Sequence, residues 1–140
     1  MPARPAPRHL VDVCGAEAPF LLDCSRTGRV VHLFEDAPTV RPASHVFEYG
    51  QLIVRTLVPE AALCGVVAIT YHVDNIRTAI GTGWSVTATG PAEVIDGPDE
   101  MAHSRRTLRG WTHGPHDTLL RIHPQSVSGF RLARTEEVHS

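Results

Sequence analysis

The junction of a strand and a short helix, residues 55–62, carries residue types that could bind an anion. It reads Arg55-Thr56-Leu57-Val58-Pro59-Glu60-Ala61-Ala62. A helix start attracts phosphate through its free N–H groups and its positive dipole end, and Arg55 can add a bidentate contact. Glu60 opposes this, because a carboxylate in the first turn repels a phosphate dianion. The residues alone leave an anion site and an ordinary junction equally open.

Other clusters of reactive residue types favour structural interpretations. The run His113-Gly114-Pro115-His116-Asp117 has the glycine and proline of a loop, so we expect a polar loop there rather than a metal site. His32, His72 and His123 fall within predicted strands, where a hydrogen-bonded structural histidine is expected. The chain has no GxSxG nucleophile motif, and Gly81-Thr82-Gly83 lacks the third glycine of a dinucleotide fingerprint.

The composition predicts one compact domain and excludes several classes of function. The chain has 140 residues, 42% of them hydrophobic, and a formal net charge of -2. All 13 basic side chains are arginine, which rules out Schiff-base lysine chemistry. The balanced charge and few aromatics argue against nucleic acid, and no apolar run could span a membrane, so we expect a cytoplasmic protein. The three cysteines, Cys14, Cys24 and Cys64, are interpreted as reduced and mostly buried.

Short strands must position any site, because they make up most of the predicted elements. Residues 1–8 are expected to form a loose arm, and the spacing of Leu10, Val13, Cys14 and Leu21 predicts one or two short helices. Further helices are predicted at 59–64 and 98–109. The predicted strands are 29–34, 39–48, 52–56, 66–73, 84–94, 118–123 and 127–132. Strands linked mostly by hairpins indicate an antiparallel barrel with helices outside it.

The order of several motifs resembles the pyridoxamine 5'-phosphate oxidase-like family. The most specific match is Gly83-Trp84-Ser85-Val86-Thr87-Ala88-Thr89-Gly90-Pro91-Ala92, which is similar to that family's GWSVxVxGxA strand. Three further segments occur in the family's order, namely Pro38-Thr39-Val40-Arg41-Pro42, Leu52-Ile53-Val54-Arg55-Thr56 and Leu120-Arg121-Ile122-His123-Pro124. The likeness covers residues 17–134, nearly the whole domain.

The resemblance implies a mainly β (α+β) fold, an antiparallel split β-barrel with short flanking helices. Members form homodimers that hold FMN, or in some branches a deazaflavin or haem, at the subunit interface. Under this interpretation residues 1–16 are a flexible arm and lead-in, residues 17–134 are the flavin-binding-like domain, and residues 135–140 are a tail. A fold by itself does not establish an activity, so the function must be argued from the residues of the site.

Carried over by position, the resemblance places the flavin phosphate at Arg55 and Thr56 and the isoalloxazine edge at Ser85. The full set of candidate cofactor-binding residues is Arg41, His45, Arg55, Thr56, Trp84, Ser85 and Trp111. Each has an ordinary alternative, because Arg55 could form a surface pair, Ser85 could be a satisfied strand hydroxyl, and the two tryptophans could be core residues. No catalytic residue and no substrate follow from the sequence.

One departure from the family pattern bears directly on the cofactor. Relatives commonly carry a basic residue, often lysine, in the short helix after the Arg-Thr pair, where this chain has Ala61 and Ala62. Losing a charge-assisted contact of about 1.5–3 kcal/mol would weaken FMN binding by roughly 10- to 100-fold. Three hypotheses follow: an FMN-dependent oxidoreductase on an unknown small molecule, a cofactor-free dimeric binding module on the same fold, or a deazaflavin-dependent reductase.

Overall fold

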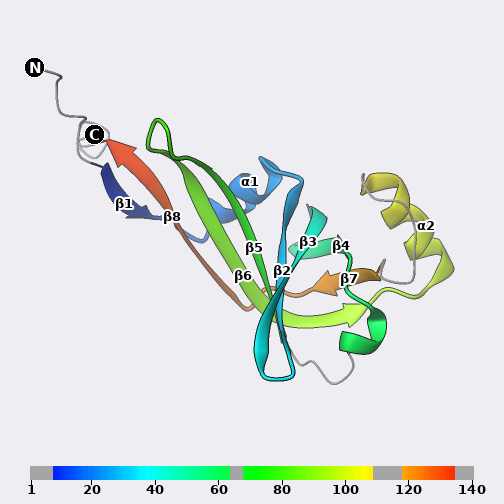
Figure 1. Cartoon of the computed structure of the whole chain (residues 1–140). Helices are drawn as coiled ribbons and strands as arrows, with labels where there is room; N and C mark the ends of the chain where they lie inside the picture. The colour runs from blue at the N-terminus through cyan, green and yellow to red at the C-terminus, as the bar shows by residue number, and fades with distance from the viewer. Residues whose placement is uncertain (1–7, 64–67, 109–117, 135–140) are drawn as a thin grey trace, which may run out of the picture.

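A computed structural model describes residues 8–63, 68–108 and 118–134 (Figure 1). The elements in chain order are β1 (Arg8–Asp12), α1 (Ala18–Asp23), β2 (Thr27–Phe34), β3 (Ala37–Glu48), β4 (Gln51–Thr56), the 3-10 helix η1 (Glu60–Leu63), β5 (Ala68–Arg77), β6 (Thr82–Val94), α2 (Pro98–Thr107), β7 (Thr118–Ile122) and β8 (Ser126–Arg134). The strands form one antiparallel sheet, in the order β1-β8-β6-β5-β2-β3-β4-β7, and β6 also pairs with β7. The sheet therefore closes on itself as a split barrel with short helices beside it, the predicted fold class.

Closure of the barrel depends on the long strand β6, which changes partner along its length. Its first part pairs with β5 and β8, whereas Ala92, Glu93 and Val94 pair with β7. At the change of partner, a Cβ on Gly90 would clash with the carbonyl oxygen of His123. Only glycine permits this close approach of two backbones.

Two apolar clusters hold the sheet. The larger fills the barrel and includes Val30, Leu52, Val54, Tyr71, Val73, Val86, Leu120 and Ile122. The smaller lies between α2 and the outer face of the sheet and consists of Ile53, Ile95, Leu108 and Leu119, with Val46 and Met101 packed against it. No helix within the described ranges is long and apolar enough to span a membrane.

The N-terminal segment differs from the prediction. Residues 8–12 form β1, which pairs with β8 from Arg8 opposite Arg134 to Asp12 opposite Phe130. The spacing of Leu10 and Val13 predicted a helix, and this prediction is wrong for residues 8–12, which form a strand. Leu10 is 67% exposed, so no buried helix face exists there, and the free edge of β8 offers backbone hydrogen bonds instead.

The interpretation of the cysteines as mostly buried is also wrong for the two cysteines that the structure describes. Cys14 and Cys24 are free and exposed, one before α1 and the other directly after it. Helix α1 buries Ala18 and Leu22 instead, which leaves the flanking residues outside. Cys64 lies outside the described residues.

Candidate functional site

Strand pairing places two predicted site residues on the outer face of the sheet. Side chains alternate between the two faces of a strand. Because Val54 and His45 point into the barrel, Arg55 and Ser44 point outward, and the register sets these two residues directly opposite each other. On β6, Trp84 and Val86 point inward, so Ser85 points outward, opposite Asp74 on β5.

Strand β2 joins these two pairs into one row across the sheet. Thr27 lies opposite Ser44 on one side, and Thr27 and Asp74 line the same small pocket on the other. The row therefore runs Ser85, Asp74, Thr27, Ser44, Arg55 across β6, β5, β2, β3 and β4. Four strand spacings amount to about 19 Å along the surface. The row thus has a guanidinium and a hydroxyl at one end and the Ser85 hydroxyl at the other.

The Arg55 end has the chemistry of an anion site. Arg55 is 3% exposed and Ser44 4% exposed, so a guanidinium and a hydroxyl are both withdrawn from solvent. The Oγ of Ser44 is buried and has no hydrogen-bond partner within the described part of the chain. Buried polar atoms are nearly always satisfied, so an orphaned donor beside a cation fits an anionic group with free oxygen atoms.

Thr56 faces the other way from Arg55. It is fully buried, and its Oγ1 donates a hydrogen bond to the Pro42 carbonyl oxygen at 3.3 Å. This side chain therefore helps to fix the end of β4 against β3. Its neighbour Arg55 is the residue of the pair that reaches the outer face.

Helix η1 adds no cation to this end of the molecule. Its four residues are Glu60, Ala61, Ala62 and Leu63. Glu60, Ala61, Leu63 and Val94 line a hollow of about 420 Å³. The short helix therefore carries Glu60, Ala61 and Ala62 in the region where relatives commonly have a basic residue.

The Ser85 end consists of hydrogen-bonding side chains. Ser85 is 5% exposed, and its Oγ lies 3.4 Å from His72 Nε2. His72 also contacts Thr87 and Asp74, so it is a hydrogen-bonded histidine within a strand, as predicted. Trp84 points to the opposite face and is part of the barrel core, with 8% of its surface exposed.

His45 lies inside the barrel rather than beside Arg55. Its Nε2 donates to the Leu22 carbonyl oxygen at 2.8 Å, and its Nδ1 accepts from the Tyr71 hydroxyl at 2.7 Å. Burial lowers the pKa of His45 and raises that of Tyr71, because the charged form of each is poorly solvated there. Both ring nitrogens are occupied in the core, so this arrangement leaves none for the predicted cofactor contact.

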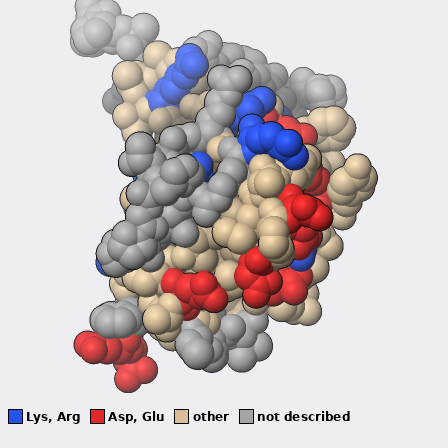
Figure 2. Space-filling view, turned by 90° about the vertical axis from the view of Figure 1, so that its right-hand side faces the viewer, with Lys and Arg blue, Asp and Glu red and all other residues tan. Residues whose placement is uncertain are grey.

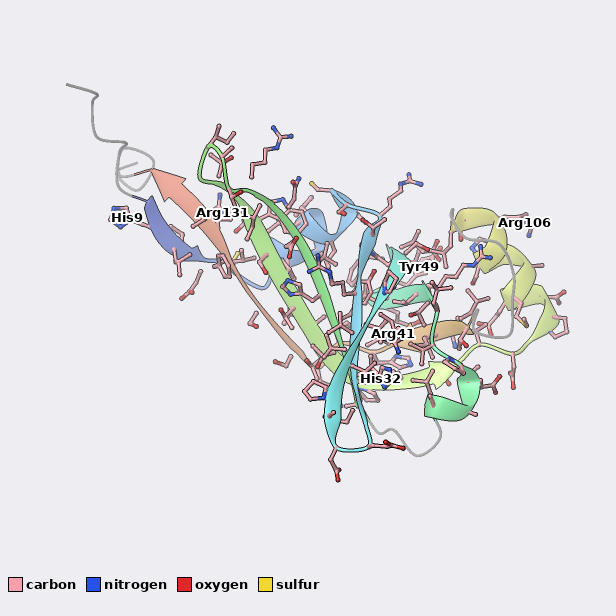
Figure 3. All side chains as sticks on the ribbon, viewed as in Figure 1. His9, His32, Arg41, Tyr49, Arg106 and Arg131 are labelled. Carbon is pink, nitrogen blue, oxygen red and sulfur yellow. The ribbon has the colours of Figure 1, made fainter. Side chains whose placement is uncertain are left out.

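Arg41 stands apart from the row. It is exposed on β3, and its guanidinium donates to the Val40 carbonyl oxygen at 3.2 Å. Figure 3 shows it on the β2–β3 hairpin, where His32 is also labelled. Strand alternation and the register put Arg41 on the face of Val30, opposite to that of Arg55. Trp111 and the 113–117 loop lie outside the described residues.

A second hollow lies between α2 and the β3–β4 hairpin. It measures about 380 Å³, and its lining includes Val46, Glu48, Ile53, Asp99, Glu100, His103 and Arg121. Asp and Glu side chains gather on this side of the molecule (Figure 2). Arg121 is held by Glu93 at 2.9 Å and by Glu100, and its hydrogen bond keeps the pKa of Glu93 below the usual range. The remaining carboxylates make this groove unfavourable for a phosphate.

Comparison with known proteins identifies the family. The family model described as pyridoxamine 5'-phosphate oxidase matches residues 16–131. The chain belongs to this family. A Mycobacterium tuberculosis (strain H37Rv) protein without an established role is 34% identical over 133 residues, which cover 89% of this chain and 87% of that protein.

Solved structures of this pyridoxamine 5'-phosphate oxidase fold agree with the barrel. An FAD-binding protein from Mesorhizobium loti superposes with a TM-score of 0.74 at 16% identity, covering 91% of this chain and 100% of the other. An FAD-binding protein from Mycobacterium smegmatis superposes with a TM-score of 0.64 at 20% identity, covering 90% and 99%. At these identities the likeness shows the fold alone.

Sequence reasoning missed the residues in the middle of the row. Asp74 and Thr27 were not singled out, and neither was Ser44. One local signal was available, because His72 and Asp74 are two residues apart in a strand and so share a face. Their proximity to Ser85 depends on strand register, which local patterns do not specify.

Proposed function

We propose that this chain binds a flavin, with FMN as the first candidate, and acts as a flavin-dependent oxidoreductase on a small molecule. The observation that carries the proposal is the row from Arg55 to Ser85, which offers an anion site at one end and hydrogen-bonding groups at the other. Family membership supports it, as do two similarly folded proteins described as FAD-binding. FAD is therefore the second flavin to test.

Each end of the row has a role in this proposal. Arg55 and Ser44 hold the phosphate, and Thr56 fixes the strand end that carries Arg55. Ser85 faces the polar edge of the ring system. A bound flavin supplies hydride or electron transfer, whereas the protein supplies binding, orientation and electrostatics. The acidic groove beside α2 has the wrong charge for the phosphate, so the Arg55 end is the better location.

A homodimer completes this proposal. Leu33 is 65% exposed and Val40 49% exposed, and both lie on the outer face that carries the row. A second copy that covers this face would bury apolar surface and enclose the ligand between two subunits. A stable interface of this kind buries at least about 1,200 Å².

A cofactor-free binding module on the same fold is the second candidate. The observation that favours it is the composition of η1, where Glu60, Ala61 and Ala62 provide no positive charge for a phosphate. In this case the row would bind an uncharged or singly charged ligand. A deazaflavin-dependent reductase remains a third hypothesis, which the same cofactor screen tests.

Cofactor titration distinguishes these functions. Purified protein is titrated separately with FMN, FAD, a deazaflavin and haem, and binding is followed by flavin fluorescence quenching or absorption. We expect micromolar FMN affinity that Arg55→Ala weakens at least tenfold, with Ser44→Ala as a milder second variant. Arg77→Ala is the matched control, because Arg77 is exposed at the far end of β5. Absence of quenching at high micromolar FMN and FAD would reject the flavin proposal.

A further inference from the structure

A hydrogen-bonded chain of three side chains crosses from β6 to β5 on the outer face. Thr87 Oγ1 lies 2.9 Å from His72 Nδ1, and His72 Nε2 lies 3.0 Å from Asp74 Oδ2. The side chains of His72 and Asp74 are 29% and 33% exposed, so these two groups are accessible to a bound molecule. We call Thr87, His72 and Asp74 the outer triad. None of the three is in the set of cofactor candidates derived from the sequence.

The direction of each hydrogen bond follows from the chemistry of its atoms. A carboxylate only accepts, so Nε2 carries a hydrogen and donates it to Asp74. In the neutral ring Nδ1 then has a lone pair and accepts from the Thr87 hydroxyl. If a second proton binds at Nδ1, that nitrogen donates to Thr87 Oγ1 instead. His72 can therefore gain and release a proton without losing either partner.

The charged groups around His72 suit this exchange. Asp74 on its own strand stabilises an imidazolium, and Arg29 from β2 lies 3.6 Å from the same Asp74 oxygen. Strand β6 contributes only the neutral hydroxyls of Thr87 and Ser85. Asp74 and Arg29 are therefore the charged groups that face His72 in the described part of the chain.

Two members of the outer triad, His72 and Asp74, border a small pocket. Thr27, Gly28, Arg29, His72 and Asp74 line a volume of about 110 Å³. Since one water occupies about 30 Å³ in the liquid, the pocket admits a few waters or one small polar group. The side chain of Arg29 is 59% exposed at this pocket. Ser85, at the ring end of the row, contacts His72 directly.

We infer that the outer triad is a proton relay for a molecule bound at the Ser85 end of the row, an inference that rests on the proposed flavin site. A weakly acidic N–H or O–H group of the substrate gives its proton to Thr87 Oγ1 while the hydroxyl proton of Thr87 moves to His72 Nδ1. The substrate becomes one unit more negative and His72 one unit more positive. Asp74 stabilises the imidazolium at Nε2, and the reverse transfer returns the proton.

The relay assigns a different role to each member. Thr87 is the group that meets the substrate. His72 stores the proton and Asp74 positions the ring, so both act through Thr87. The substrate class is a small polar molecule whose oxidation or reduction changes the number of bound protons.

Histidine NMR and redox titration test the relay with readouts independent of turnover. The ring signals of His72 are recorded with and without FMN, and those of His103, which lies on α2, serve as the internal control. We expect FMN to change the ring signals of His72 and to leave those of His103 unchanged. Asp74→Asn removes the carboxylate that accepts from Nε2, so it should change the His72 ring signals as well.

The midpoint potential of bound FMN is then measured against pH. We expect the slope to change within the measured pH range, and both His72→Gln and Thr87→Val should abolish that change, whereas His103→Gln should retain it. If FMN binds but the His72 ring signals and the slope of potential against pH stay unchanged, the relay is refuted and the flavin site stands. If FMN and FAD do not bind at all, the proposed function and the relay fail together.

Discussion

The Nδ1 of His45 lies 2.7 Å from the hydroxyl oxygen of Tyr71, and the two rings meet edge to face with centroids 5.1 Å apart. This pair connects β3 to β5 through the interior of the barrel, and the Nε2 of the same ring reaches the Leu22 carbonyl at α1. One buried imidazole therefore ties three elements together. The row on the outer face depends on this arrangement, because β3 carries Ser44 and β5 carries Asp74.

Tyr71→Phe should destabilise the protein by about 1–3 kcal/mol, because it leaves His45 Nδ1 unpaired in the core. Urea unfolding followed by circular dichroism measures the loss. Tyr49→Phe is the matched control: Tyr49 is 99% exposed, so the same chemical change should alter stability by less than about 0.5 kcal/mol. Equal effects of the two substitutions would contradict the structural role of the pair.

His45 should make the fold less stable in mild acid. Burial lowers its pKa from the ordinary value of 6.5, so the unfolded chain binds this proton more readily than the folded one. The free energy of unfolding therefore rises with pH from the lowered folded pKa up to about 6.5, by at most about 1.4 kcal/mol per pH unit. Urea unfolding between pH 5 and 8 should show this slope. His45→Gln should reduce it, and an unchanged slope in that variant would count against the assignment.

Gly90→Ala should destabilise the barrel by about 1–3 kcal/mol or more, because a Cβ there meets the backbone of His123 rather than a side chain that can move. Thermal or urea unfolding measures the change. Gly15→Ala provides the control, since a Cβ at Gly15 has no atom within 4 Å. Similar stabilities for the two variants would show that β6 can change partner without this contact.

Ala62→Lys combined with Glu60→Gln should tighten FMN binding by about tenfold or more, because it adds a cation and removes a carboxylate at η1. Fluorescence titration gives the dissociation constants. Ala102→Lys adds one positive charge at an exposed position of α2, half the change in net charge made at η1, and should have little effect. If both lysine variants tighten binding equally, general electrostatic attraction explains the gain and η1 is not the phosphate position.

Leu33→Glu should shift the protein from dimer to monomer, because it puts a charge into the apolar outer face proposed as the interface. Light scattering after size-exclusion chromatography measures the mass. Ile80→Glu is a control at another exposed apolar residue, at the turn between β5 and β6. A wild-type protein that is monomeric at micromolar concentration would reject the dimer.

Local sequence patterns were sufficient to predict an element where residues nearby in the chain decide its conformation. The Tyr49-Gly50 turn located β4 as a return strand, and alternation in residues 84–94 located β6 and put Ser85 on the polar face. Gly97, Pro98 and Asp99 marked the start of α2. The same reasoning failed at Leu10, because a strand there needs the edge of β8, more than a hundred residues further along the chain.

By itself, the amino-acid sequence determined strands β2 to β8, the barrel class, the family resemblance and the missing cation at residues 61 and 62, since each depends on residue type and short-range spacing. Only the tertiary structure decided that His45 is a core residue and that Arg55, Ser44 and Ser85 share one row. The physical reason is register: alternation gives a side chain one of two faces, but its neighbours across the sheet depend on how distant strands align.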